Sequence, residues 1–146
     1  MMTPKAIHIL IAEDDAEDRM LTTEAMNESR LVNRIDFVED GEELMDYFNN
    51  IGKYSDSKNY PLPGLILLDL NMPRKDGREA LREIKSSPHL KKIPVIILTT
   101  SKAEEDIIRT YDLGVNSFIT KPVTFNGMVN VMQAIGKYWL EIVELP

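Results

Sequence analysis

The stretch PLPGLILLDLNMPRKDG, residues 61–77, decides how the chain folds. It contains an unbroken apolar run, residues 65–68, which is followed by Asp69 and then by the break Asn71-Met72-Pro73. An apolar run without polar alternation is typical of a strand buried on both faces, as in a parallel sheet covered by helices. Asp69 therefore follows a rigid buried strand, and a carboxylate in that position needs a chemical explanation.

Strand-type and helix-type segments alternate on both sides of this stretch. Apolar runs predict strands at residues 7–12, 35–38, 65–70, 93–101 and 117–120. Apolar residues at helical spacing predict a helix after each strand, with Asp40 and Thr124 as N-caps and Gly114 as a C-cap. Right-handed crossovers then give an α/β fold, a doubly wound, flavodoxin-like (βα)5 parallel sheet with strand order 2-1-3-4-5.

Composition limits the classes of function. The length of 146 residues suits one domain with its own core, and 43% hydrophobic residues is ordinary for a globular protein. We expect no membrane span, because no run of about 18 apolar residues is present, and the N-terminus lacks the pattern of a signal peptide. The absence of cysteine excludes disulfides and thiolate ligands, and a cytoplasmic location is expected. The net charge of −7 argues against nucleic acid as a partner.

Polar side chains stand at the carboxyl ends of four of the predicted strands. Glu13 and Asp14 stand at the end of the first strand, Asp69 at that of the third, Thr99 at that of the fourth and Lys121 at that of the fifth. In a sheet of this order these carboxyl ends meet at one crevice. Three carboxylates packed together repel one another, and hard oxygen ligands favour Mg²⁺ or a similar divalent ion. The same acids make the first loop unsuitable for the phosphate of a flavin.

Such a set of groups is typical of a phosphoryl-transfer site. Asp69 can attack phosphorus and become an acyl phosphate, while the metal and Lys121 offset the charge on the equatorial oxygens. The hydroxyl of Thr99 can donate to a phosphoryl oxygen. Each group also has an ordinary explanation, as a helix cap, a turn residue, a β-former or a solvated cation. The prediction rests on their coincidence at the ends of four strands.

The motifs ILIAEDD, LILLDLNMPRKDG, VIILTTS and FITKP, in this order, resemble the receiver domain of two-component response regulators over nearly the whole chain. The resemblance implies that Asp69 accepts a phosphoryl group from a phosphohistidine on a sensor histidine kinase. It also implies a bound Mg²⁺, which Mn²⁺ can replace. The expected metal ligands are Asp69, Asp14, Glu13 through water, and the backbone carbonyl of Asn71.

The same resemblance assigns roles to further residues. Thr99 and Lys121 would contact the phosphoryl group, and Phe118 stands at the position of the aromatic switch residue. The peptide bond between Lys121 and Pro122 is typically cis in the family. Three positions beside the site are expected to tune the lifetime of the acyl phosphate: Asn71, Thr100 and Ser101.

Two segments narrow the resemblance to a subfamily. Residues 51–63 form an unusually long predicted loop, and residues 136–146 prolong an apolar stripe that begins at Phe125. With KDGREALREIK and IPVIILTTS, they resemble the single-domain regulators that pair with cyanobacterial phytochrome kinases. Members of that group tend to form homodimers, and an exposed apolar stripe favours an interface. The candidate contacts in the tail are Trp139, Ile142, Val143 and Leu145.

The expected function follows from this resemblance. Residues 1–146 would form a single receiver domain without a DNA-binding output domain, signalling through a phosphorylation-dependent change of its own surface. Such a protein catalyses only its own phosphorylation and dephosphorylation. A phosphate sink or a phosphorelay intermediate would have the same site. A haloacid-dehalogenase-type phosphatase is a third candidate, but that family has a second aspartate where this chain has Asn71.

Overall fold

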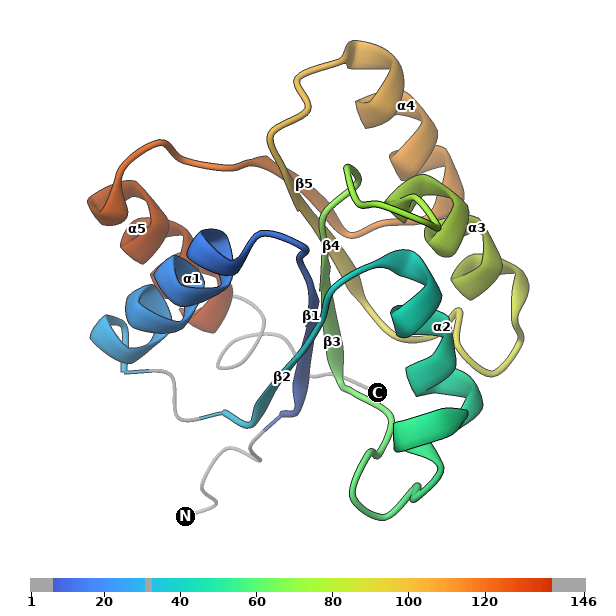
Figure 1. Cartoon of the computed structure of the whole chain (residues 1–146). Coiled ribbons are helices and arrows are strands. Elements are labelled where there is room, and N and C mark those ends of the chain that lie inside the picture. Colours follow the sequence, from blue (N-terminus) through green and yellow to red (C-terminus); the bar gives the residue numbers. More distant parts are fainter. Residues whose placement is uncertain (1–6, 31–32, 138–146) are drawn as a thin grey trace, which may run out of the picture.

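The computed structural model describes residues 7–30 and 33–137. These residues form one five-stranded parallel sheet in the order β2-β1-β3-β4-β5, flanked by helices (Figure 1). The strands are β1 (Ile9–Ala12), β2 (Ile35–Val38), β3 (Leu65–Leu68), β4 (Val95–Thr99) and β5 (Ser117–Thr120). The helices are α1 (Ala16–Glu28), α2 (Gly41–Asn49), the 3-10 helix η1 (Gly52–Tyr54), α3 (Gly77–Ser86), α4 (Glu104–Leu113) and α5 (Phe125–Ile135). The predicted fold class and strand order are confirmed.

Alternate residues of the central strands point into two separate apolar layers. Leu10 of β1 packs in the layer that includes α2 and α3, whereas its neighbour Ile11 packs in the layer that includes α1 and α5. Figure 1 shows these two groups of helices on opposite sides of the sheet. Every residue of β1, β3 and β4 is buried as a result. This double coverage explains the unbroken apolar runs of the sequence.

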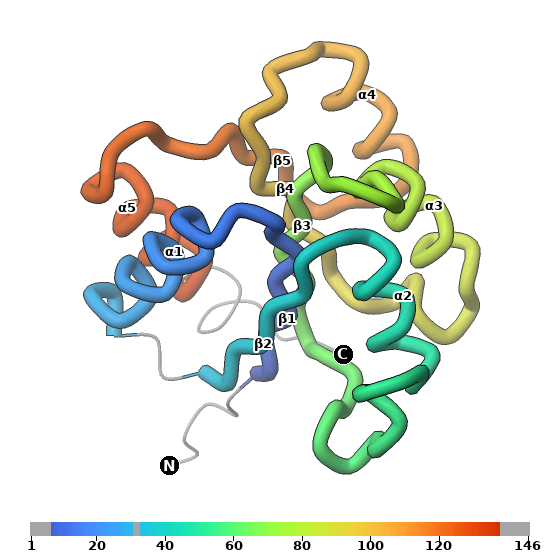
Figure 2. Tube along the Cα trace, viewed as in Figure 1, coloured from blue at the N-terminus to red at the C-terminus, as the bar shows by residue number. Residues whose placement is uncertain are grey.

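The register of the strands brings their carboxyl ends together. Ala12 pairs with Leu68 across β1 and β3, and Thr99 pairs with Thr120 across β4 and β5. The chain trace in Figure 2 shows that the connections leaving β1, β3 and β5 lie at the same end of the sheet. The residues that follow these strands therefore start from neighbouring points of one edge.

The helix caps agree with the sequence, whereas some strand bounds do not. Asp40 and Thr124 accept hydrogen bonds from the first turns of α2 and α5, and Gly114 closes α4 with a left-handed φ of 99°. Three strands are shorter than predicted: β1 begins two residues later, β3 ends two residues earlier, and β4 is shorter by two residues at each end. Phe125, where the predicted apolar stripe begins, does not belong to the core: it is 39% exposed, since it precedes the part of α5 that packs against the sheet. The tail residues Trp139, Ile142, Val143 and Leu145 lie outside the described residues.

The long loop at residues 51–63 is anchored by tyrosine rings. Tyr47 of α2, Tyr54 of η1 and Tyr60 have ring centroids 4.9 to 5.8 Å apart. The hydroxyl of Tyr47 donates a 2.8 Å hydrogen bond to the carbonyl of Pro61. Aromatic pairs of this kind stabilise a fold by about 0.5–1.5 kcal/mol each beyond their burial. The loop is thus fastened at the start of β3, whereas Asp69 follows its end.

Among residues 7–30 and 33–137, no helix combines the length and apolar character needed to cross a membrane.

Candidate functional site

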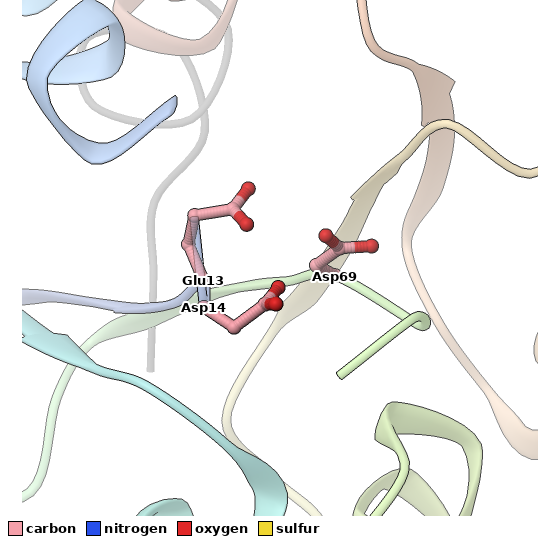
Figure 3. Close-up of side chains that lie close together, drawn as sticks. All are labelled: Glu13, Asp14 and Asp69. Carbon is pink, nitrogen blue, oxygen red and sulfur yellow. The ribbon is translucent and has the colours of Figure 1, made fainter. Parts of the chain in front are cut away.

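Three carboxylates gather where β1 and β3 end, as Figure 3 shows. Oxygens of Glu13, Asp14 and Asp69 lie within 4.8 Å of one another. Glu13 and Asp69 are buried and Asp14 is exposed, so the cluster opens to solvent on one side. Carboxylates at this spacing repel one another unless a cation lies among them, and hard oxygens are the ligands that Mg²⁺ and Mn²⁺ prefer. The donor set therefore fits the predicted divalent ion.

Asp69 is held by donors on both of its oxygens. Its Oδ1 accepts from the hydroxyl of Thr99 at 2.7 Å and from the backbone amide of Asn71 at 3.1 Å. Its Oδ2 accepts from Nζ of Lys121 at 2.9 Å. The side chain is also almost fully buried, so its position is fixed before any ligand arrives. The predicted nucleophile and the predicted phosphoryl contacts Thr99 and Lys121 do lie together.

Lys121 lies at the centre of the acidic cluster. Its Nζ is hydrogen-bonded to Glu13, to Asp18 at 3.0 Å and to Asp69 at 2.9 Å. Burial alone would lower the pKa of Lys121, but the hydrogen bonds to Glu13 and Asp69 raise that pKa above its usual value. Burial raises the pKa of Glu13 to about 7, against the opposing effect of Lys121, and the charge of Asp69 adds to this rise. The side chain of Lys121 thus remains protonated beside three acidic partners.

Asp18 was not predicted as a site residue. It lies in the first turn of α1, whose N-cap is Asp15. Acids are common in the first turn of any helix, so the sequence alone gave Asp18 no distinctive signal. Its contact with Lys121 depends on how α1 is rotated above the sheet.

Gly77 lets α3 begin directly beside Asp69. A Cβ at this position would lie 2.2 Å from the backbone carbonyl oxygen of Asp69. The amide of Gly77 also donates a 3.0 Å hydrogen bond to the carbonyl of Leu70. Only a residue without a side chain allows this close approach of the two backbones.

A second polar cluster links α3 to α4 beside the site. Nε and Nη2 of Arg78 donate to the two carboxylate oxygens of Asp106, each at 2.6 Å. The hydroxyl of Ser101 donates to the same carboxylate at 2.6 Å. The hydrogen bonds from Arg78 lower the pKa of Asp106 to about 2, so this carboxylate is ionised throughout the neutral range. This pair could not be predicted from the sequence, because its members lie on two helices whose relative placement is set by packing.

The remaining predicted residues surround this centre. Phe118 is half-buried in β5 and packs against the layer of α2 and α3. Thr100 is exposed and Ser101 is half-buried. The predicted cis peptide between Lys121 and Pro122 is wrong, because the described residues contain no cis bond. The trans form is intrinsically preferred even before proline, by about 0.5–1 kcal/mol, and Lys121 reaches its carboxylates from the trans backbone.

Comparisons with known proteins point to one family. The model of the family described as "Response regulator receiver domain" matches residues 9–133. Over 138 residues the chain is 44% identical to Response regulator Rcp1 of Synechocystis, an alignment that covers 94% of this chain and 92% of that protein.

Two solved structures have the same fold over almost their whole length. One is the phosphorylated cyanobacterial phytochrome response regulator RcpA, with 42% identity, coverage of 97% of this chain and 99% of that chain, and a TM-score of 0.89. The other is the Mn²⁺-bound form of Rcp1, with 43% identity, coverage of 96% and 99%, and a TM-score of 0.86. Because the family match spans most of the sequence and these relatives share its fold, the chain belongs to the family of response regulator receiver domains.

Proposed function

We propose that Asp69 accepts a phosphoryl group from the phosphohistidine of a sensor histidine kinase, in a reaction that needs Mg²⁺. The observation that supports this proposal is the arrangement around Asp69. Thr99 and Lys121 donate to its two oxygens, and the acids Glu13 and Asp14 lie beside it. Two similar structures carry the relevant groups, since RcpA was solved phosphorylated and Rcp1 with Mn²⁺.

In the proposed reaction one oxygen of Asp69 attacks phosphorus. The bond from phosphorus to the histidine nitrogen breaks, its electron pair stays on that nitrogen, and an acyl phosphate forms. A divalent ion bound by Asp14, Asp69, the backbone carbonyl of Asn71 and, through water, Glu13 would offset negative charge on the phosphoryl oxygens. Lys121 keeps its proton throughout, because its acidic neighbours hold its pKa high, and it supplies a fixed positive charge.

Phosphorylation would then alter the surface near β5. The hydroxyl of Thr99 would leave Asp69 for a phosphoryl oxygen, and the half-buried Phe118 would move into the space behind it. The faces of α4, β5 and α5 would be repacked as a consequence. Residues 1–146 would thus act as one receiver domain that needs no attached output domain to signal.

The partners follow from the relatives. We propose a phytochrome-type histidine kinase as the phosphoryl donor, because RcpA, which is 42% identical to this chain, is a phytochrome response regulator. A homodimer formed through the tail that contains Trp139, Ile142, Val143 and Leu145 also stays a proposal, as does a cytoplasmic location. A phosphatase of the haloacid-dehalogenase type is disfavoured, because Asn71 replaces the second acid of that family.

Phosphoryl uptake tests the proposal directly. The protein would be incubated with acetyl phosphate, with or without Mg²⁺, and its intact mass would be measured. We expect the gain of one phosphoryl group that requires Mg²⁺ and disappears in Asp69→Asn. The control is Asp112→Asn, an exposed acid on α4. Equal uptake by the Asp69→Asn protein would refute the proposed acceptor.

A further inference from the structure

Hydrogen bonds form a closed ring that starts and ends at Asp69. On one side the Thr99 hydroxyl donates to Oδ1 of Asp69 at 2.7 Å, and the amide of Ser101 donates to the Thr99 hydroxyl at 3.4 Å. On the other side the amide of Asn71 donates to the same oxygen of Asp69 at 3.1 Å. The branch through Thr99 leads into the loop that follows β4, and the branch through Asn71 leads into the loop that follows β3.

Arg78 and Asp106 join these two branches. The side chain of Asp106 accepts the hydroxyl of Ser101 at 2.6 Å and both Nε and Nη2 of Arg78 at 2.6 Å. Nη2 of Arg78 also donates to Oδ1 of Asn71 at 3.4 Å. A bidentate pair between guanidinium and carboxylate is both strong and strict in its geometry. The shortest bonds of the ring are therefore those of Asp106, at 2.6 Å, and the longest, at 3.4 Å, are those donated by the amide of Ser101 and by Nη2 of Arg78.

The Ser101 hydroxyl is held toward α4 by this arrangement. Its single proton is donated to Asp106, and its oxygen accepts the amide of Ala103, the N-cap of α4, at 3.3 Å. A serine hydroxyl has one proton and two lone pairs to offer. Both neighbours of the Ser101 hydroxyl belong to the start of α4, whereas the backbone of Ser101 lies one hydrogen bond from Thr99. Without Asp106 the side chain of Ser101 would be free to turn toward Asp69.

We propose that Asp106, fixed by Arg78, holds the Ser101 hydroxyl away from the acyl phosphate of Asp69 and so lengthens the lifetime of the phosphorylated state. This inference rests on the proposed function of Asp69. Hydrolysis ends that state: a water oxygen bonds to phosphorus, the bond from phosphorus to Asp69 breaks, and inorganic phosphate leaves. The water gives up a proton to solvent and the carboxylate of Asp69 is restored. A released Ser101 hydroxyl would hydrogen-bond this water and orient it. Asp106 and Arg78 are thus positioning residues that act through Ser101.

A double-mutant cycle separates this route from a general loosening of the loop. The wild-type protein, Asp106→Ala, Ser101→Ala and the double variant would be phosphorylated with acetyl phosphate and Mg²⁺. The donor would then be removed and the decay of the acyl phosphate followed by intact mass. We expect Asp106→Ala to raise the decay rate about fivefold in the wild-type background and to have no effect in the Ser101→Ala background. A loosened loop would instead raise the decay rate in both backgrounds.

Three further variants keep the test decisive. Asp106→Asn keeps the shape of the side chain, and it replaces Asp106→Ala if that protein does not fold. Arg78→Lys keeps the charge but cannot donate two bonds in a plane, so it should raise the decay rate by a smaller factor that also depends on Ser101. Glu105→Ala is the control on the same helix, because it removes only an exposed ion pair with Arg109.

The outcomes are distinguishable. Equal decay rates for the phosphorylated wild-type, Asp106→Ala and Asp106→Asn proteins would overturn the inference and leave the proposed function intact. An equal acceleration in both Ser101 backgrounds would overturn the route through Ser101. A wild-type protein that takes up no phosphoryl group would instead contradict the proposed function, and this inference with it.

Discussion

The hydroxyl of Thr99 lies 2.7 Å from Oδ1 of Asp69, so the proposed acceptor is already hydrogen-bonded to the residue expected to bind its phosphoryl group. Phosphorylation would have to exchange this bond for a new one. The hydroxyl has a single proton, and it cannot serve the carboxylate and a phosphoryl oxygen together. The Thr99 hydroxyl would therefore have a different acceptor in each of the two states. This exchange of one hydrogen bond would be the first step of the conformational change.

Magnesium should stabilise the protein by binding the folded state. At a concentration ten times its dissociation constant, Mg²⁺ would add about 1.4 kcal/mol. This corresponds to a rise of about 4 °C in Tm for a chain of this size. Scanning calorimetry at matched ionic strength measures the rise, and Asp14→Asn should remove most of it. An equal rise in that variant would place the ion elsewhere.

Replacing Lys121 by alanine should destabilise the fold, because it leaves the buried carboxylates of Glu13 and Asp69 without their cation. Removing one partner of a buried charge pair costs about 3–5 kcal/mol. Burial already raises the pKa of Glu13 to about 7, and without the opposing effect of Lys121 this pKa would rise further. The stability of the variant should therefore fall as the pH increases from 5 to about 8. Urea unfolding at several pH values measures this effect, with Lys102→Ala, an exposed lysine, as the control.

A methyl group at position 77 should disturb the acceptor itself. In Gly77→Ala the new Cβ would meet the carbonyl oxygen of Asp69 at 2.2 Å, so one backbone must move. We expect a loss of about 1–3 kcal/mol, as for other overpacked sites, together with slower phosphoryl uptake. Gly52→Ala is the matched control. Its φ of 64° strains the backbone, but the space around it is open, so uptake should be unchanged.

The contribution of Asp106 to stability should depend on pH. The pKa of Asp106 falls from 3.8 to about 2 in the folded protein, chiefly because Arg78 hydrogen-bonds its ionised form. A depressed pKa stabilises the fold above the unfolded value, and this stabilisation is lost as the pH falls from about 5 toward 2. Asp106→Asn should therefore lose about 2 kcal/mol at pH 7 relative to the wild-type protein. The difference in stability between the two proteins should be smaller at pH 3 than at pH 7, and urea titrations at both pH values measure it. An equal difference at both pH values would show that the ion pair is unimportant.

The tail should govern self-association. Deleting residues 138–146 removes Trp139, Ile142, Val143 and Leu145, the apolar residues expected at a dimer interface. We expect sedimentation velocity to show a dimer of the full chain and a monomer of the shortened chain. Measurements with and without beryllium fluoride would show which state favours association. A full-length monomer under both conditions would contradict the proposed interface.

The parts of the site that could be predicted are those that backbone topology alone brings together. Asp69 and Lys121 each follow a strand and Thr99 ends one, and a parallel sheet aligns strand ends whatever the helices do. Asp18, Arg78 and Asp106 lie on helices, and their contacts depend on how each helix is rotated and spaced. That arrangement is set by packing between residues far apart in the chain. The prediction of a cis peptide bond after Lys121 was wrong for a different reason. It rested on the resemblance to the family, and no feature of the local sequence required it.

The tyrosine-anchored loop gives the molecule a site for engineering. Residues 56–58 are exposed, and they lie within the loop that precedes β3, whereas the chemistry follows that strand. A peptide tag or a fluorescent label inserted there would be separated from Asp69 by the full length of a buried strand. Because Tyr54 and Tyr60 fasten the loop on both sides of the insertion, the label would report on binding or assembly without altering the lifetime of the signal.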